Sequence, residues 1–348
     1  MMNQTETRRP DFDFENFTFG VQSTDRMLMA AYKQGEWSDY RIAPVQSVSL
    51  SPLAMCFHYG QTVFEGLKAF RMTDGKINVF RMESHWKRMN RSLERMAMPP
   101  LPRNLFMDGI LELLKMESDW VIDDPDYSLY IRPFVIATES KLGVDASQEY
   151  LFMVVLSPMR AYYNKPLKVK VETEYIRSAR GGAGAAKNGG NYGASLLPQI
   201  NAKKEGFDQI IWLDAQEKKY IEESGTMNIL FLLSGETLLT PSLSDSILDG
   251  ITRDSLLKLA REEGFTVEER PVAIEEIIQR IENGERVEAF GAGTAAVISP
   301  IETISFKGKA FATYLEADAG MYRLKNKLSS IRKGLNPDTY GWNQLLDA

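Results

Sequence analysis

The chain has 348 residues, of which 44% are hydrophobic and 25% charged, and its formal net charge is −6 at pH 7. This length exceeds what one hydrophobic core usually organises, so two domains are expected. The acidic balance excludes a general nucleic-acid binder. With one cysteine, Cys56, and two histidines, the chain has no internal disulfide bond, and we expect no metal site.

The amino-terminal region shows none of the features of a targeting segment. Positions 1–17 mix acidic and basic side chains and lack the apolar core of a signal peptide. No apolar run in the chain approaches the ~20 residues needed to cross a bilayer. We therefore expect a cytoplasmic protein that does not associate with membranes.

Residues 1–156 predict a first domain of the α+β class, because helices and strands come in blocks. Apolar residues recur at helical spacing in two stretches, and two later stretches are rich in aromatic and β-branched residues. The expected elements are, in order, short strands within 40–56, helices around 86–96 and 105–114, and strands at 127–138 and 150–156.

Residues 157–166 read SPMRAYYNKP and are expected to connect the two domains, because a proline near each end disfavours regular structure. The second domain is expected at 167–348 and begins with an alternating strand. Its further predicted elements are strands at 209–213, 228–233 and 286–290, and helices at 252–263, 274–282 and 317–333.

The most informative segment for function is RGGAGAAKNGGNYG, residues 180–193, in which glycines and alanines surround Lys187. Small residues let the backbone approach a ligand closely. The segment is not a Walker A loop, because alanine precedes the lysine and asparagine follows it. By itself it is also compatible with a solvated lysine in a flexible loop.

Three further segments are candidate ligand sites, and each has a plainer structural reading. IEESGTMN (221–228) sets acids before a Gly-Thr turn, where they could face a cationic atom or only solvent. LDGITR (248–253) leads into a helix whose first N–H groups could bind an anion, or it is an ordinary helix cap. FGAGTAA (290–296) is a small-residue turn able to bind phosphate or carboxylate through its amides, or a simple tight turn.

Taken in this order, the motifs resemble those of the branched-chain amino-acid aminotransferases, which are fold-type IV pyridoxal-phosphate enzymes. The segments that carry the resemblance are YGQTVFEGLKAFR (59–71), FRMESHWKRMNRS (80–92), YIRP (130–133), KNGGNYG (187–193), EESGTMN (222–228), LDGITR and FGAGTAA. The resemblance implies a smaller α+β amino-terminal domain and a larger, barrel-like carboxy-terminal domain with helices. It also implies transfer of an amino group between L-leucine, L-isoleucine or L-valine and 2-oxoglutarate, with pyridoxal 5′-phosphate as cofactor.

The resemblance assigns the cofactor contacts. Lys187 is expected to hold the cofactor covalently and to carry the Cα proton. Tyr192 is expected to hydrogen-bond the phenolic oxygen of the cofactor, and Glu223 to pair with its pyridine nitrogen, which keeps that nitrogen protonated. The residues expected to hold the phosphate are Arg88, Ile251, Thr252 and Thr294.

The resemblance also assigns the substrate contacts. The substrate carboxylate is expected to bind at Thr226, at Ala295 and at Tyr59 of the partner subunit, so the protein is expected to be a homodimer with shared active sites. The residues expected to form the side-chain pocket are Phe64, Tyr130 and Tyr162, together with Arg132, which would help to accept the second carboxylate of glutamate. Small amino acids and 2-oxo acids are therefore the expected ligands.

The sequence departs from the family at a few positions. Met82 and His85 stand where the family often has proline and asparagine, and Ser23 stands where animal enzymes have a pocket phenylalanine. Ala296 and Ser299 occupy the positions of a redox-active cysteine pair in the animal enzymes, so that switch is expected to be absent. The competing interpretations are a D-amino-acid aminotransferase, an aminodeoxychorismate lyase, or a phosphate-binding module without enzymatic activity.

Overall fold

The computed structural model describes residues 12–160 and 165–347, and the chain forms two compact units. The first unit contains the residues up to Tyr162 together with Ser330–Ala348, and the second contains Tyr163–Ser329. The two units are therefore of similar size. The sequence predicts a second domain that spans the whole of 167–348, whereas the segment from Ser330 onward belongs to the first unit.

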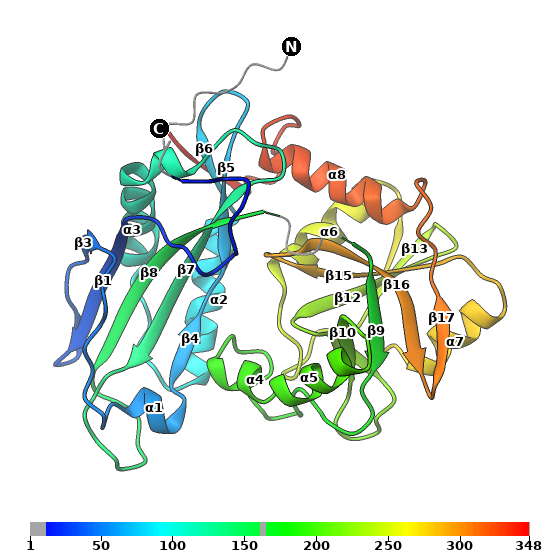
Figure 1. The fold of residues 1–348 in the computed structure, drawn as a ribbon, viewed down its shortest axis with the longest axis horizontal. Coiled ribbons are helices and arrows are strands. Elements are labelled where there is room, and N and C mark those ends of the chain that lie inside the picture. Colours follow the sequence, from blue (N-terminus) through cyan, green and yellow to red (C-terminus); the bar gives the residue numbers. More distant parts are fainter. Residues whose placement is uncertain (1–11, 161–164, 348) are drawn as a thin grey trace. The chain divides into compact units, whose positions relative to one another are not determined.

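The first unit is built on a nine-stranded antiparallel sheet with the order β18-β6-β5-β7-β8-β1-β2, to which β3 adds on β1 and β4 on β7 (Figure 1). The strands are β1 (Arg26–Lys33), β2 (Glu36–Trp37), β3 (Arg41–Pro44), β4 (Thr62–Phe64), β5 (Leu67–Arg71), β6 (Ile77–Phe80), β7 (Ser128–Ala137), β8 (Tyr150–Met159) and β18 (Asn343–Leu346). The last strand explains why the carboxy-terminal segment belongs to this unit, because β18 pairs with β6 over its whole length.

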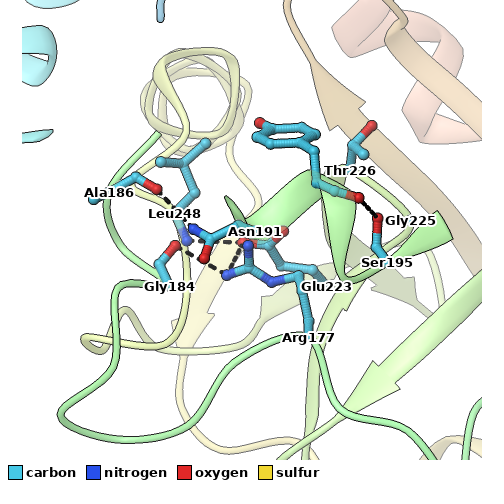
Figure 2. A pocket seen from close by; sticks show the side chains of 10 residues that line it. Arg177, Gly184, Ala186, Asn191, Ser195, Glu223, Gly225, Thr226 and Leu248 are labelled. Carbon is cyan, nitrogen blue, oxygen red and sulfur yellow. Dashed lines mark hydrogen bonds and ion pairs between the residues drawn. The ribbon is translucent and has the colours of Figure 1, made fainter. Parts of the chain in front are cut away.

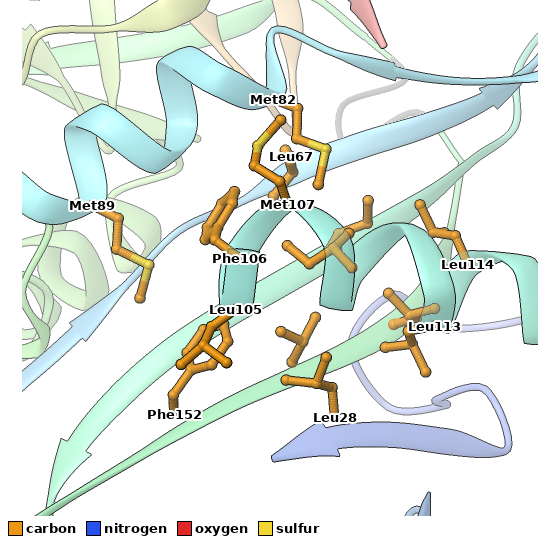
Figure 3. Close-up of a cluster of buried hydrophobic side chains, with 14 of the residues drawn as sticks. Leu28, Leu67, Met82, Met89, Leu105, Phe106, Met107, Leu113, Leu114 and Phe152 are labelled. Carbon is orange, nitrogen blue, oxygen red and sulfur yellow. The ribbon is translucent and has the colours of Figure 1, made fainter. Parts of the chain in front are cut away.

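Two amphipathic helices, α2 (Met82–Arg95) and α3 (Arg103–Met116), pack on this sheet, as the helical spacing predicted. Figure 3 shows apolar side chains of α3, among them Leu105 and Leu113, between the helix and the strands that carry Leu28 and Phe152. The remaining helices of this unit are α1 (Met55–Tyr59) and the 3₁₀-helix Ser118–Trp120. Burial of one continuous apolar face is what holds the helices to the sheet.

The expected connection at 157–166 begins later than the sequence indicated. Strand β8 continues through Met159, because it pairs with β7 from Tyr150 opposite Ala137 to Met159 opposite Ser128. Pro158 lies inside this pairing. The described part of 157–166 therefore begins as strand.

The second unit contains a closed ring of strands, as the expected barrel-like domain requires. Its elements are β9 (Leu167–Val171), β10 (Gln209–Leu213), β11 (Ile221–Ser224), β12 (Met227–Leu233), β13 (Thr237–Thr240), β14 (Thr266–Glu269), β15 (Val287–Gly293), β16 (Val297–Phe306) and β17 (Lys309–Ala312), with helices α4 (Gly189–Gly193), α5 (Leu196–Lys204), α6 (Ile251–Glu262), α7 (Ile274–Glu282) and α8 (Gly320–Arg332). The pairings β9–β10–β11–β12–β15–β16–β9 close the ring, and apolar side chains of these strands form one buried cluster.

One end of this barrel gathers the loops that carry the sequence motifs. The β11–β12 turn and the β15–β16 turn are neighbours, because Asn228 of β12 pairs with Ala292 of β15. The amide of Asn228 also donates to the carbonyl oxygen of Leu248 at 2.9 Å, which brings the start of α6 to the same end. Residues from three separate motifs thus meet in space. In the described ranges, no helix is long and apolar enough to span a membrane.

Candidate active site

Lys187 lies in the loop between β9 and α4, and its Nζ donates a hydrogen bond to the hydroxyl oxygen of Tyr192 at 2.8 Å. The loop is held by asparagines that the sequence did not single out. The side-chain amide of Asn191 donates to the carbonyl oxygens of Ala183 at 2.8 Å and Ala186 at 2.9 Å. The glycine- and alanine-rich segment therefore contains a short helix, α4, and presents the lysine in a defined orientation.

Glu223 lies on β11 and is 3% exposed. Its Oε1 accepts a hydrogen bond from the backbone N–H of Leu248 at 2.8 Å and forms an ion pair with Arg177 at 3.1 Å. A buried carboxylate needs such partners, because an unpaired charge away from water is costly. The acid is therefore fixed within the site and does not lie on a solvated turn.

The β11–β12 turn consists of Gly225 and Thr226, and it requires the glycine. Gly225 has φ +58°, and a Cβ at this position would lie 2.1 Å from the side-chain oxygen of Gln209. The turn is anchored from β10, since Trp212 Nε1 donates to the carbonyl oxygen of Gly225 at 2.9 Å. Thr226 is consequently presented at the barrel end, where it is exposed.

One pocket combines these groups (Figure 2). Its lining residues are Arg177, Gly184, Ala186, Asn191, Tyr192, Ser195, Glu223, Gly225, Thr226 and Leu248. Three residues named from the sequence, Tyr192, Glu223 and Thr226, line it, and Lys187 donates a hydrogen bond to Tyr192. A phenol and a buried acid thus line one pocket, and the amine of Lys187 is hydrogen-bonded to the phenol.

Arg177 is a site residue that the sequence analysis missed. Besides pairing with Glu223, its guanidinium donates to the carbonyl oxygen of Gly184 at 3.1 Å and to that of Ser246. A single arginine in an irregular loop forms no pattern that could have identified it. Its partners come together only once the loop has folded onto the segment before α6.

The expected phosphate ligands of the second unit lie at two backbone positions suited to an anion. Ile251 and Thr252 form the first turn of α6, whose leading N–H groups have no partner within the helix. Thr294 and Ala295 lie in the turn between β15 and β16. Both loops lie at the same barrel end as Asn228.

The remaining phosphate candidate, Arg88, lies in the first unit and is held by Glu65. Arg88 is buried, and its Nε and one terminal nitrogen donate to the two carboxylate oxygens of Glu65 at 2.7 and 2.9 Å. His85 Nδ1 is 2.7 Å from the same carboxylate. Burial alone would raise the pKa of Glu65, but the charges of Arg88 and His85 hold it well below its usual range. This cluster was not anticipated from the sequence.

The other substrate candidates also lie in the first unit. Arg132 donates to the hydroxyl oxygen of Tyr130 at 3.0 Å and lies over the Phe64 ring, 4.7 Å from its centre, so these three side chains form one cluster. The hydroxyl of Tyr59 donates to the carbonyl oxygen of Leu142. Tyr162 lies outside the described residues.

Comparison with known proteins agrees with these features. The family model described as amino-transferase class IV matches residues 62–304. The chain is 46% identical over 339 residues to branched-chain-amino-acid transaminase 1 of Bacillus subtilis, covering 95% of this chain and 94% of that protein. It is 44% identical over 334 residues to the branched-chain-amino-acid aminotransferase of Mycolicibacterium smegmatis, covering 93% and 90%.

Solved structures agree with the fold. The branched-chain amino acid aminotransferase of Escherichia coli has a TM-score of 0.73 and 25% identity over 90% of this chain and 98% of its own. The branched-chain amino acid aminotransferase of Thermobaculum terrenum, solved in its PLP form, has a TM-score of 0.75 and 22% identity over 92% of this chain and 98% of its own. These likenesses confirm the predicted fold class, and the relatives confirm the resemblance drawn from the motifs. The chain belongs to the class IV aminotransferases, the family of pyridoxal-phosphate-dependent transaminases that its sequence motifs indicated.

Proposed function

We propose that this protein is a branched-chain amino-acid aminotransferase, which exchanges the amino group of L-leucine, L-isoleucine or L-valine with 2-oxoglutarate. The products are the branched-chain 2-oxo acids and L-glutamate. The observation that carries the proposal is the pocket lined by Tyr192 and Glu223, with Lys187 hydrogen-bonded to Tyr192, in a chain 46% identical to a relative named for this activity.

The residues of the pocket fit pyridoxal 5′-phosphate. The chemistry requires an amine that can bond to an aldehyde, an acid for a protonated ring nitrogen, a donor for a phenolic oxygen and an anion site for the phosphate. Lys187, Glu223 and Tyr192 supply the first three, and the N-terminus of α6 supplies the fourth. When bound, the cofactor supplies an electron sink for the Cα carbon and a temporary carrier for the amino group.

The chain's own groups then have separate tasks. Lys187, in its neutral form, would take the proton from the substrate Cα and pass it to the cofactor within the same half-reaction, and in the other half-reaction it would carry a proton in the reverse direction. Tyr192 orients that amine through the hydrogen bond at 2.8 Å. Glu223 would keep the ring nitrogen protonated, and its contacts with Leu248 and Arg177 hold the carboxylate in place.

The phosphate would be held by the amides of Ile251 and Thr252, by the turn at Thr294 and by Arg88. Anchoring through these groups keeps the cofactor bound between the two half-reactions. Glu65 supports the role of Arg88, because a bidentate pair holds the guanidinium in one orientation.

The substrate carboxylate would bind at Thr226 and Ala295, helped by Tyr59 of a second copy of the chain. Phe64, Tyr130 and Tyr162 would wall the side-chain pocket, and Arg132 would accept the second carboxylate of glutamate. One methylene changes binding by only ~1–3 kcal/mol in an apolar pocket, so the enzyme should accept leucine, isoleucine and valine with little discrimination. We also propose that the protein is a homodimer and that it is located in the cytoplasm.

The substrate proposal is tested by steady-state assay of the purified protein loaded with pyridoxal 5′-phosphate. With 2-oxoglutarate as acceptor, L-leucine, L-isoleucine and L-valine should all yield L-glutamate, whereas D-alanine should not. Turnover of D-alanine alone would indicate a D-amino-acid aminotransferase, and formation of 4-aminobenzoate from aminodeoxychorismate would indicate the lyase.

The shared site is tested by mixing two inactive variants. After subunit exchange, hybrids of Tyr59→Ala and Lys187→Ala would place both defects in one site and leave the other intact. Activity should therefore return. If exchange is confirmed by mass spectrometry and no activity appears, Tyr59 serves its own subunit.

A further inference from the structure

Two adjacent glutamates of β11, Glu222 and Glu223, line different cavities. The pairing of β11 with β10 is irregular at this point, because Trp212 lies opposite Glu223 and Leu213 lies opposite Ile221, which leaves Glu222 without an opposite residue on β10. Glu223 lines the pocket that contains Tyr192, whereas Glu222 lines a separate cavity of about 520 Å³. Both side chains are buried, Glu222 to 7% exposure. The catalytic roles proposed above use Glu223 only.

Both acids hold the same stretch of chain, residues 244–248, which we call the hub segment. The hydroxyl of Ser246 donates to Oε1 of Glu222, and the backbone N–H of Leu248 donates to Oε1 of Glu223 at 2.8 Å. Glu222 therefore holds the hub segment through Ser246, and the hub segment holds Glu223 through the N–H of Leu248.

The hub segment also holds the rest of the candidate site. The carbonyl oxygen of Asp245 accepts from the backbone N–H of Ala185 at 2.8 Å, and its carboxylate accepts from that of Gly181 at 2.6 Å. Gly184 packs so closely that a Cβ there would lie 2.5 Å from the carbonyl oxygen of Ser246. The loop that carries Lys187 thus rests on this segment.

Arg177 connects the hub segment to Glu223 a second time. Its guanidinium donates to the carbonyl oxygen of Ser246 and pairs with Glu223 at 3.1 Å. A shift of Ser246 would therefore move both the N–H and the guanidinium that face the Glu223 carboxylate. When reacting groups must be aligned, a displacement of about 1 Å is enough to lower the reaction rate substantially.

Glu222 is not explained as a simple structural acid. Its Oε2 is buried and has no hydrogen-bond partner among the described residues. Burial without a full set of partners is unfavourable for a carboxyl group. An apolar residue would fill this position at lower cost if packing were the only requirement, so the hydrogen bond to Ser246 is the feature that the glutamate adds.

We propose that Glu222 is a positioning residue for the transamination site: by accepting the hydrogen bond from Ser246, it holds the hub segment that fixes Glu223. The proposal rests on the proposed function, in which Glu223 faces the pyridine nitrogen. Glu222 itself does not line the pocket that contains Tyr192 and Glu223.

The test compares Glu222→Ala, Glu222→Gln, Ser246→Ala and the double variant Glu222→Ala/Ser246→Ala. Glu217→Ala is the matched control, because Glu217 lines the same cavity with an exposed side chain. For each protein we would measure the affinity of the apoprotein for pyridoxal 5′-phosphate, the single-turnover rate with L-leucine and the melting temperature of the apoprotein.

Glu222→Ala and Ser246→Ala should each weaken cofactor affinity or slow the single turnover on the order of tenfold. The double variant should be no worse than the worse single variant, since both changes remove one contact. Glu222→Gln should remain within about twofold of wild type, because its carbonyl oxygen can still accept from Ser246. Glu217→Ala should match wild type. If Glu222→Ala does not fold, a comparison of Ser246→Ala with Glu222→Gln still tests the hydrogen bond between Ser246 and Glu222.

Wild-type values in Glu222→Ala, full additivity of the two changes, or equal losses in Glu222→Gln and Glu222→Ala would overturn the proposal. So would a loss that follows the melting temperature across all variants, because that result indicates a purely structural role. The proposed function fails separately, if the wild-type protein binds the cofactor and does not react with L-leucine. The affinity series then still decides the role of Glu222.

Discussion

Lys187 Nζ donates a hydrogen bond to the hydroxyl oxygen of Tyr192 at 2.8 Å, although both residues lie in a stretch of sequence dominated by glycine and alanine. The short helix α4 makes this contact possible, because it brings the tyrosine back toward the loop that carries the lysine.

Tyr192→Phe should keep the fold and lose rate. The variant removes one hydrogen bond from the amine, and a single such bond is worth about 0.5–1.5 kcal/mol, so we expect a fall of roughly two- to tenfold in the single-turnover rate with L-leucine. Stopped-flow absorbance measures this rate directly. An unchanged rate would mean that Tyr192 does not orient Lys187 during the reaction.

Glu223→Gln should retain much of the cofactor and lose most of the activity. An amide cannot keep a proton on the pyridine nitrogen, so the ring accepts electrons less well. About 2–4 kcal/mol of barrier is a plausible cost for one electrostatic contact of this kind. The half-reaction rate and the cofactor content of the same sample separate chemistry from binding. Wild-type rates in this variant would contradict the assigned role.

Several elements could be predicted because one local pattern determined them. The strand predicted at 209–213 and the helix predicted at 274–282 have the same bounds as β10 and α7. Helix α6 begins one residue before its predicted start. Strand β1 was not expected, because its run of buried residues does not alternate between two faces. Strand β18 was missed because its partner, β6, lies far away in sequence.

The candidate site was predictable to a similar extent. Lys187 and Glu223 stand in short motifs, so their types and neighbours identified them. Arg177 and Glu222 were missed, since each acts through the hub segment at 244–248, which reaches them only in the folded barrel. Glu65 was missed for the same reason, because its partners Arg88 and His85 come from α2.

Glu65→Ala should destabilise the first unit strongly. It leaves Arg88 buried without its bidentate partner, and breaking a buried pair in this way costs about 3–5 kcal/mol. Glu65→Gln, which keeps the shape of the side chain but not its charge, should lose less stability than Glu65→Ala. Denaturant unfolding of the apoprotein measures both.

The sign of the pH effect at Glu65 follows from its lowered pKa. The folded state favours the ionised form, so its contribution to stability is present above the unfolded pKa of ~4.3 and is lost as the pH falls below that value. Wild type and Glu65→Gln should therefore approach each other in stability at acidic pH. A constant difference from pH 7 to pH 3 would contradict the ion-pair account.

For Glu222→Gln, the difference in stability from wild type should depend on pH in the opposite direction to that for Glu65→Gln. Burial raises the pKa of Glu222 to about 7, against the lowering effects of Ser246 and Arg177 and with added repulsion from Glu223 and Asp214. The folded state then binds the proton more tightly than the unfolded chain, so wild type loses stability as the pH rises from its unfolded pKa near ~4.3 through about 7. The glutamine cannot titrate.

Melting curves of apoprotein at a series of pH values check this prediction. Glu222→Gln should match wild type near pH 4 and melt at a higher temperature than wild type at pH 8. The control Glu217→Gln should follow wild type throughout. Identical curves for wild type and Glu222→Gln at pH 8 would show that the Glu222 carboxyl is not desolvated.

The central claim, that Lys187 carries out amino transfer from branched-chain amino acids, is tested most directly by one spectroscopic measurement. The purified protein, loaded with pyridoxal 5′-phosphate, is mixed with L-leucine in the absence of any 2-oxo acid, and the cofactor spectrum and the released 4-methyl-2-oxopentanoate are followed together. Wild type should convert the cofactor to its amine form and release about one equivalent of the oxo acid per site, whereas Lys187→Ala should bind the cofactor and release none. Oxo acid release by Lys187→Ala at the wild-type rate, or none from the loaded wild-type protein, would contradict the account.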